Sequence, residues 1–231
     1  MLRRVHTPRL HVGSITLDPS GSKHARDVLR LDEGDQVEIF DDAGNVAVGA
    51  IVALSPSVVV RVASITSSPA KVFDLTIASA IPKGERADWM IEKLSELGVS
   101  RFIPLATERS VVLPEGRNKR DRWIRIATES AKQSRRAGVM QIDELTQLKE
   151  VVARAPRSCS YLSPEASAGT EPLPPSTLLV GPEGGWTDDE IQLFARSDIQ
   201  PLKLTQTILR IETAAIAAAA IVLTSNSPRH P

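Results

Sequence analysis

A glycine-rich turn between an apolar segment and the start of a helix has the composition of a ligand-binding loop. The apolar residues 177–180 indicate a strand, and Gly-Pro-Glu-Gly-Gly at 181–185 predicts a sharp turn after it. Thr187 and Glu190 have the spacing of a capping box, so we expect a helix to begin there. Backbone N–H groups of such a turn can approach a nucleotide-like ligand closely. No Lys-Ser or Lys-Thr pair follows, which disfavours phosphate binding, and an ordinary tight turn is the alternative.

A second segment whose residues could take part in a reaction lies between Leu202 and Ala215. In it, a short strand and a polar bend lead into a helix. Arg210 and Glu212 stand where that helix begins, a cation and a carboxylate two residues apart. Six alanines between 214 and 220 allow this helix to approach another backbone very closely. The alternative is a surface ion pair on an alanine-rich core helix.

Basic residues concentrate in one predicted helix. Between 109 and 136 there are nine basic and three acidic residues, although the whole chain has 28 of each. A helix over 120–136 would present a charged face and a less polar opposite face, which suits docking on a domain while facing phosphates. The charged face consists of Arg122, Arg125, Glu129, Lys132 and Arg136, opposite Trp123, Ala127, Ser130 and Ser134. Residues 1–30 are also basic. The alternative is a solvated surface.

Composition and missing motifs exclude several classes of protein. The 231 residues are 42% hydrophobic and 24% charged, as in ordinary globular proteins. The longest apolar run, 214–223, is shorter than the roughly 20 residues of a membrane span, and the N-terminus does not resemble a signal peptide. Cys159 is the single cysteine, and the four histidines lack metal-ligand spacing. We therefore expect a cytoplasmic protein with no metal and no membrane contact.

The elements that must position these residues fall into two groups, and the first is a small β domain. A hairpin over 37–52 with its turn at 41–45, and a β-branched strand over 58–62, are predicted from alternation and turn residues. Residues 22–31 have helical spacing. Many short strands and one helix in about 65 residues favour a small β-barrel, and 66–70 is a plausible linker.

After this linker, strands alternate with helices, which predicts an α/β domain with a mostly parallel sheet. The apolar run 73–81 is typical of a strand buried on both faces. The Ser-, Pro- and Ala-rich stretch 156–175 is expected to be a surface connection. Further strands are predicted at 101–105, 177–180 and 202–204. Further helices are predicted at 86–97 (ended by Gly98), 120–136, 188–195 and 211–224.

Together these segments resemble one family along nearly the whole chain, the RsmE family of 16S ribosomal RNA (uracil-N3)-methyltransferases in the SPOUT superfamily. The most specific match is Gly-Pro-Glu-Gly-Gly at 181–185 followed by Leu-Arg-Ile-Glu-Thr-Ala at 209–214. The other matching segments are 24–31, 34–35, 83–86, 89–99, 108–110 and 133–136.

The resemblance implies a PUA-like β-barrel over 1–68 and a SPOUT α/β domain over 71–231 with a C-terminal trefoil knot. It also implies a homodimer, S-adenosylmethionine as cofactor, and N3 of one uridine in small-subunit ribosomal RNA, within the assembled 30S subunit, as the target. Arg210 would stabilise negative charge on the pyrimidine, and Glu212 would orient Arg210 or accept the N3 proton. The residues expected to bind the cofactor are Leu179, Gly181, Glu183, Gly184, Leu204, Thr205, Ile208 and Leu209.

The RNA is expected to contact the basic helix and several further cations. These residues are Arg3, Arg4, Arg30, Lys93, Arg109, Arg122, Arg125, Gln133, Arg135 and Arg136.

The chain departs from the family's usual pattern in the second motif. Thr205 replaces a glycine and Thr207 an arginine, and Val139 or Met140 stands where a proline is common. A side chain at 205 would crowd the cofactor if φ there were positive. Two alternatives therefore stay open: a non-catalytic ribosomal-RNA-binding or assembly protein on the same scaffold, and an enzyme acting on small nucleotides.

Overall fold

The computed structural model describes residues 2–67, 73–114, 117–154, 158–166 and 176–226. The chain forms two compact units, one of residues 1–71 and 128–139, the other of residues 72–127 and 140–231. The predicted domain boundary between 68 and 71 lies outside the described residues. Of the predicted linker 66–70, the described part is a short strand, β6 (Thr66–Ser67).

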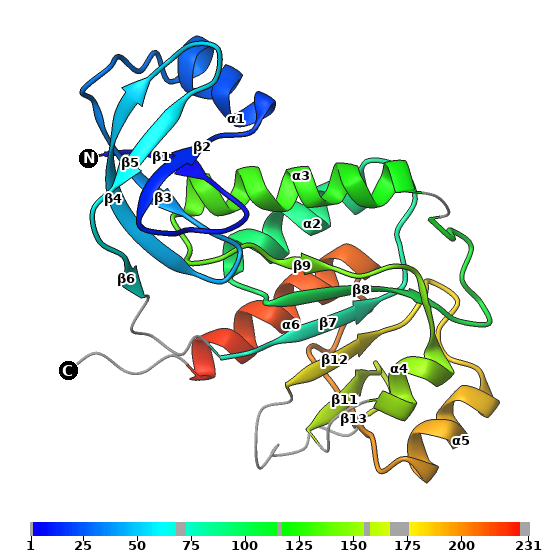
Figure 1. Cartoon of the computed structure of the whole chain (residues 1–231). Coiled ribbons are helices and arrows are strands. Elements are labelled where there is room, and N and C mark those ends of the chain that lie inside the picture. Colours follow the sequence, from blue (N-terminus) through cyan, green and yellow to red (C-terminus); the bar gives the residue numbers. More distant parts are fainter. Residues whose placement is uncertain (1, 68–72, 115–116, 155–157, 167–175, 227–231) are drawn as a thin grey trace. The chain divides into compact units, whose positions relative to one another are not determined.

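The first unit contains a six-stranded sheet and a short helical segment (Figure 1). The strand order is β1-β3-β4-β5-β2, with β6 paired to β4, and only β1 and β3 are parallel. The strands are β1 (Arg3–His6), β2 (Gly13–Thr16), β3 (Gln36–Phe40), β4 (Asn45–Ala53) and β5 (Val59–Val62). The predicted helix over 22–31 is observed earlier, as α1 (Pro19–Lys23) continued by a π-helix (His24–Val28).

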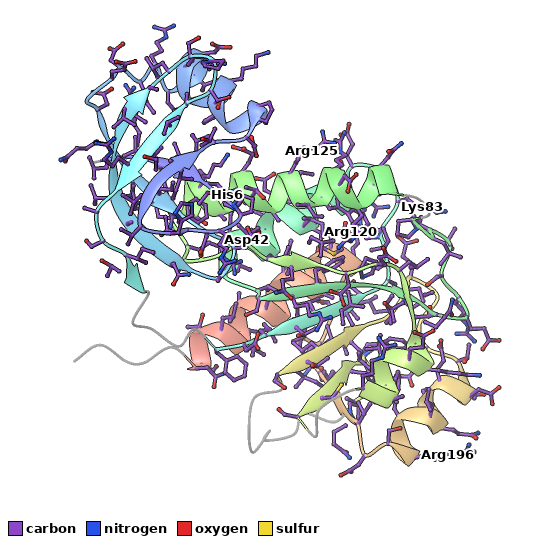
Figure 2. All side chains as sticks on the ribbon, viewed as in Figure 1. His6, Asp42, Lys83, Arg120, Arg125 and Arg196 are labelled. Atoms are coloured by element: carbon purple, nitrogen blue, oxygen red, sulfur yellow. The ribbon has the colours of Figure 1, made fainter. Side chains whose placement is uncertain are left out.

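The hairpin between β3 and β4 is confirmed, and its turn is organised by one carboxylate. Asp41 is buried and accepts hydrogen bonds from the backbone and side-chain nitrogens of Asn45 and from the backbone N–H of Leu10. Burial alone would raise the pKa of Asp41, but these donors together hold it below its ordinary value. Beside this turn, His6 Nε2 in β1 lies 2.7 Å from Asp42 Oδ1 (Figure 2).

The second unit is an α/β domain, as predicted. Its seven strands have the order β10-β8-β7-β12-β11-β13, with β9 also paired to β8, and every pairing is parallel (Figure 1). The first four strands are β7 (Thr76–Ser79), β8 (Arg101–Ala106), β9 (Gln141–Ile142) and β10 (Thr146–Gln147). The last three are β11 (Cys159–Leu162), β12 (Thr177–Val180) and β13 (Gln200–Leu202). All four residues of β12 are buried, which explains why Leu178, Leu179 and Val180 are all apolar.

The helices of this unit mostly follow the predicted ranges. They are α2 (Arg86–Leu97), α4 (Leu148–Arg154), α5 (Asp188–Arg196) and α6 (Ile211–Asn226), and α3 (Arg117–Ser134) contributes residues to both units. Gly98 ends α2 with φ 102°, and Thr187 and Glu190 form the predicted capping box of α5. Helices α2 and α6 pack against each other.

Three sequence predictions for this unit were wrong or displaced. The stretch 156–175 is not only a connection, because its residues 159–162 form β11 in the sheet; residues 156–157 and 167–175 lie outside the described part. The strand predicted at 202–204 is observed at 200–202. No element was predicted for residues 141–154, which form β9, β10 and α4. Within the described ranges, no helix has the length and apolar character needed to cross a membrane.

Candidate functional site

A hollow of about 280 Å³ opens where three neighbouring parallel strands of the second unit end. Leu162, Val180 and Leu202, the last residues of β11, β12 and β13, line it. The remaining lining comes mainly from the segments 181–186 and 204–211, the two segments singled out from the sequence. Ligands of open α/β sheets bind at this carboxyl edge, so the sheet topology brings the two motifs together at a ligand site.

The glycine-rich loop is shaped by Trp186. A β-carbon on Gly181 would lie 2.9 Å from Cε2 of the indole, so Gly181 is needed to make room for this ring. The indole Nε1 donates to the carbonyl of Leu162 at 2.9 Å, and the ring packs edge-on against Tyr161 and Phe194. Gly181, which was expected to leave room for a ligand, therefore also leaves room for the side chain of Trp186 in its own loop.

A second loop, which follows β8, holds the glycine-rich loop in place by hydrogen bonds. Arg109 donates to the carbonyls of Gly184 at 2.7 Å and Trp186 at 3.3 Å. The backbone N–H of Glu108 donates to the Glu190 carboxylate at 3.0 Å. Arg109, which was predicted to hold RNA, is exposed, and its guanidinium also shapes the wall of the hollow.

The opposite wall contains the two threonines that depart from the family pattern. Thr205 does not have a positive φ, so its side chain creates none of the anticipated left-handed strain. Its hydroxyl donates to the carbonyl of Thr207 at 2.7 Å and accepts from the Thr207 N–H at 3.3 Å. These bonds close a local turn at the rim of the hollow.

A second hollow adjoins the first, because Ile208 and Leu209 line both. It contains Arg210 and Glu212, together with the exposed Trp89 and with Arg86 at the start of α2. Glu212 is buried and its carboxylate lies 3.4 Å from Arg86, whereas the Arg210 side chain makes no hydrogen bond or ion pair with the described part of the chain. The expected partnership of Glu212 with Arg210 is thus replaced by one with Arg86.

Most of the residues predicted to bind a cofactor do line the first hollow. Leu179 is the exception, because it is fully buried in the core of the sheet while its neighbour Val180 faces the hollow. The predicted residues that line the first hollow are Gly181, Glu183, Gly184, Leu204, Thr205, Ile208 and Leu209.

The predicted RNA-binding residues of the first unit divide into buried and exposed side chains. Arg4 is only 8% exposed; it pairs with Glu38 at 2.7 Å and lies 3.9 Å over the ring of Phe40. Arg4 therefore stabilises its own unit instead of presenting its charge to RNA. Arg136 is partly buried, and burial of its guanidinium lowers its pKa to about 10. The remaining predicted residues of this unit, which are exposed, are Arg3, Arg30, Gln133 and Arg135.

In the part of α3 that belongs to the second unit, the predicted faces are observed, with Arg122 and Arg125 exposed and Trp123 and Ala127 buried; Arg136, predicted on the charged face, lies beyond the end of the helix. Trp123 is buried and donates from its indole nitrogen to Asp88 at 2.9 Å, which anchors the helix to α2. Arg122 is exposed and pairs with the same carboxylate, while Arg125 is exposed without a recorded partner among the described residues (Figure 2). Lys93 pairs with Glu92 and Glu96, and its hydrogen bonds to these carboxylates raise its pKa.

Sequence reasoning missed three contributors to the site. Arg86 and Trp186 were quoted as parts of motifs but given no role, and the segment 162–165, which lines the first hollow, lay in the presumed surface connection. The short segment Cys-Ser-Tyr-Leu at 159–162 was only a weak signal for the last of these.

Comparison with known families defines the class of protein. The chain matches the RNA methyltransferase PUA domain over residues 17–62 and the RNA methyltransferase domain over residues 68–223. The two matched domains are thus those of an RNA methyltransferase. Two relatives carry the name ribosomal RNA small subunit methyltransferase E. The one from Synechocystis is 33% identical over 218 residues (90% of this chain and 72% of the relative), and the one from Bacillus subtilis is 33% identical over 217 residues (84% of each). The chain belongs to this family.

Solved structures agree with this assignment. A ribosomal RNA small subunit methyltransferase E from Neisseria gonorrhoeae, bound to S-adenosylmethionine, has a TM-score of 0.87 and 26% identity. A methyltransferase from Legionella pneumophila, also with this cofactor, has a TM-score of 0.86 and 29% identity. Each comparison covers 97% of this chain and 98% of the other.

Proposed function

We propose that this protein transfers a methyl group from S-adenosylmethionine to N3 of one uridine in small-subunit ribosomal RNA. The observation that carries the proposal is the hollow at the carboxyl ends of β11, β12 and β13, lined by both family motifs. Family membership and the cofactor named for two similar structures support the same reaction.

The lining of the first hollow fits this cofactor. Its charged residues are two carboxylates, Glu165 and Glu183, and Arg109, which is already bonded to backbone carbonyls. No lysine is present, and the rest is largely apolar or backbone. Such a lining suits a ligand with positive charge and no phosphate. S-Adenosylmethionine, when bound, supplies an electrophilic methyl group, and the loops 181–185 and 204–209 would hold it.

Arg210 and Glu212 are proposed to act on the pyrimidine from the second hollow. Uracil N3 carries a proton at neutral pH and becomes a nucleophile only when that proton leaves. The Arg210 guanidinium has no hydrogen-bond or ion-pair partner in the described part of the chain and can stabilise the negative charge that develops on the carbonyl oxygens of the pyrimidine. Glu212 is a carboxylate within the same hollow and can accept the proton.

The RNA backbone is proposed to contact exposed cations of each unit. In the second unit these include Arg122 and Arg125 on α3. In the first unit they include Arg3, Arg30 and Arg135, with Gln133 as a neutral donor. Phosphate contacts of this kind supply affinity, and the hollow supplies the choice of base.

The assembly and location of the protein are further parts of this proposal. We propose a homodimer that acts on the 30S subunit in the cytoplasm. Trp89 and Ile208, which are 47% and 88% exposed, line one hollow, and apolar surface of this kind is what a second copy would cover. The C-terminal trefoil knot implied by the resemblance stays a prediction.

The experiment that tests the proposal is methylation of 30S subunits from a strain that lacks its own enzyme, with labelled S-adenosylmethionine. Digestion of the RNA and mass spectrometry should give N3-methyluridine at one position, and light scattering should give the mass of a dimer. Cofactor binding without methyl transfer would favour the non-catalytic alternative. That alternative was based on Thr205 and Thr207, and the absence of a positive φ at Thr205 weakens it.

A further inference from the structure

Arg86 occupies a position that is electrostatically unfavourable for its own helix. It is the first residue of α2, where the unpaired N–H groups of the helix create partial positive charge. A cation at this end destabilises a helix unless anions lie nearby. Two carboxylates do lie nearby: Glu212 Oε1 is 3.4 Å from Nη1 of Arg86, and Glu183 Oε1 is 3.7 Å from Nη2.

Glu212 depends on this cation more than Glu183 does. The Glu212 side chain is 6% exposed, whereas that of Glu183 is 49% exposed. Oε2 of Glu212 is buried and has no hydrogen-bond donor among the described residues. A buried carboxylate is costly without compensation, and Arg86, which donates from Nη1 to the other oxygen, Oε1, at 3.4 Å, supplies that compensation.

The two carboxylates belong to different walls of the site. Glu183 lies in the glycine-rich loop after β12, and Glu212 in the first turn of α6, directly after the 204–209 segment. One terminal nitrogen of the Arg86 guanidinium donates to Glu212 and the other forms an ion pair with Glu183, so a single side chain contacts both carboxylates.

We propose that Arg86 is a positioning residue of the methyl-transfer site. It joins Glu183, which lines the first hollow, to Glu212, which lines the second, and so fixes the spacing of the two segments that carry them. The inference rests on the proposed function, since it assigns Arg86 to the same reaction. Arg86 touches neither reacting atom; it acts through the two carboxylates.

The test compares four variants of the full chain with the wild type. Arg86→Met removes the charge and keeps the bulk of the side chain. Arg86→Lys keeps a charge but lacks the two-edged donor geometry. Arg86→Met/Glu212→Gln removes both charges of the buried pair. Arg154→Met is the matched control, because Arg154 is 76% exposed on α4 and pairs only with Glu150 among the described residues. Urea unfolding, calorimetric Kd for S-adenosylmethionine, and kcat on 30S subunits are measured for each.

We expect that, across the variants, the Kd for S-adenosylmethionine does not change in parallel with the midpoint of urea unfolding. Arg86→Met should lower the unfolding midpoint, raise the cofactor Kd about tenfold and reduce kcat on the order of 100-fold, as small misplacements in active sites do. Arg86→Met/Glu212→Gln should recover the unfolding midpoint but not the Kd. Arg86→Lys should recover the midpoint and only part of the affinity, and the Arg154 variant should match the wild type.

Two outcomes would overturn the inference. Arg86→Met could bind cofactor and turn over like the wild type, or the Kd could follow the unfolding midpoint through the whole series, which would make Arg86 purely structural. A wild-type protein that neither binds S-adenosylmethionine nor methylates 30S subunits would instead refute the proposed function, and this inference with it.

Discussion

The indole of Trp186 fills the space that a side chain at position 181 would require. The nearest approach, between the added β-carbon of residue 181 and Cε2 of Trp186, would be 2.9 Å. The ring is held from its other side by a hydrogen bond to Leu162 and by edge-on contacts with Tyr161 and Phe194. Packing within the loop therefore requires a glycine at position 181, independently of any ligand.

The first prediction concerns this packing. Gly181→Ala should lower the free energy of unfolding by about 1–3 kcal/mol, since overpacking forces the indole to move. Chemical denaturation measures this directly. The double variant Gly181→Ala/Trp186→Phe is the control, because a smaller ring relieves the clash but loses the bond to Leu162. If the two substitutions are strictly additive, the proposed contact does not determine the choice of glycine.

The second prediction concerns the threonine at the rim of the hollow. Thr205→Gly restores the family's usual residue, yet it should weaken cofactor binding about 3- to 10-fold. The substitution removes the hydrogen bonds between Thr205 and Thr207, each worth about 0.5–1.5 kcal/mol. It also gives the backbone at position 205 more conformational freedom. Thr205→Ser retains the hydroxyl and should bind normally. Tighter binding by the glycine variant in calorimetric titration would show that the threonine is an obstruction after all.

The third prediction separates surface arginines from buried ones. Arg125→Met on α3 should weaken binding to ribosomal RNA and reduce the slope of log K against log salt concentration by about 1. Arg196→Met, an exposed arginine on α5, should leave both quantities unchanged (Figure 2). Arg4→Met should chiefly destabilise the first unit, because Arg4 pairs with Glu38 and donates to the carbonyl of Ala131. An Arg125 variant with wild-type affinity and salt slope would remove α3 from the RNA surface.

The fourth prediction concerns the single cysteine. Burial raises the pKa of the Cys159 thiol to about 12, so the native thiol stays protonated at pH 8–9. The native protein should resist alkylation there, whereas the urea-unfolded chain should react. Because the unfolded thiol loses its proton first, this group's contribution to stability should decrease as the pH rises from about 9 toward 12. Rapid alkylation of the native protein at pH 8 would contradict the burial of Cys159.

The sequence alone was sufficient for elements that local patterns specify. Helix α2 begins and ends at the predicted residues because apolar spacing and Gly98 mark it, and the start of α5 follows from Thr187 and Glu190. Strand β12 was recognised by its unbroken apolar run. The family motifs likewise identified both walls of the hollow, since they are contiguous stretches of chain.

The partners of individual side chains were decided only by the tertiary structure. Strand β11 was missed because four residues in a Ser- and Pro-rich stretch carry little local signal, and pairing with β12 and β13 makes them a strand. Glu212 was assigned to Arg210, its neighbour in sequence, but it pairs with Arg86, which is 126 residues away. Periodicity describes which face of an element is buried. It does not say which distant element lies against that face, and the sheet order and the packing of α2 on α6 determine that contact.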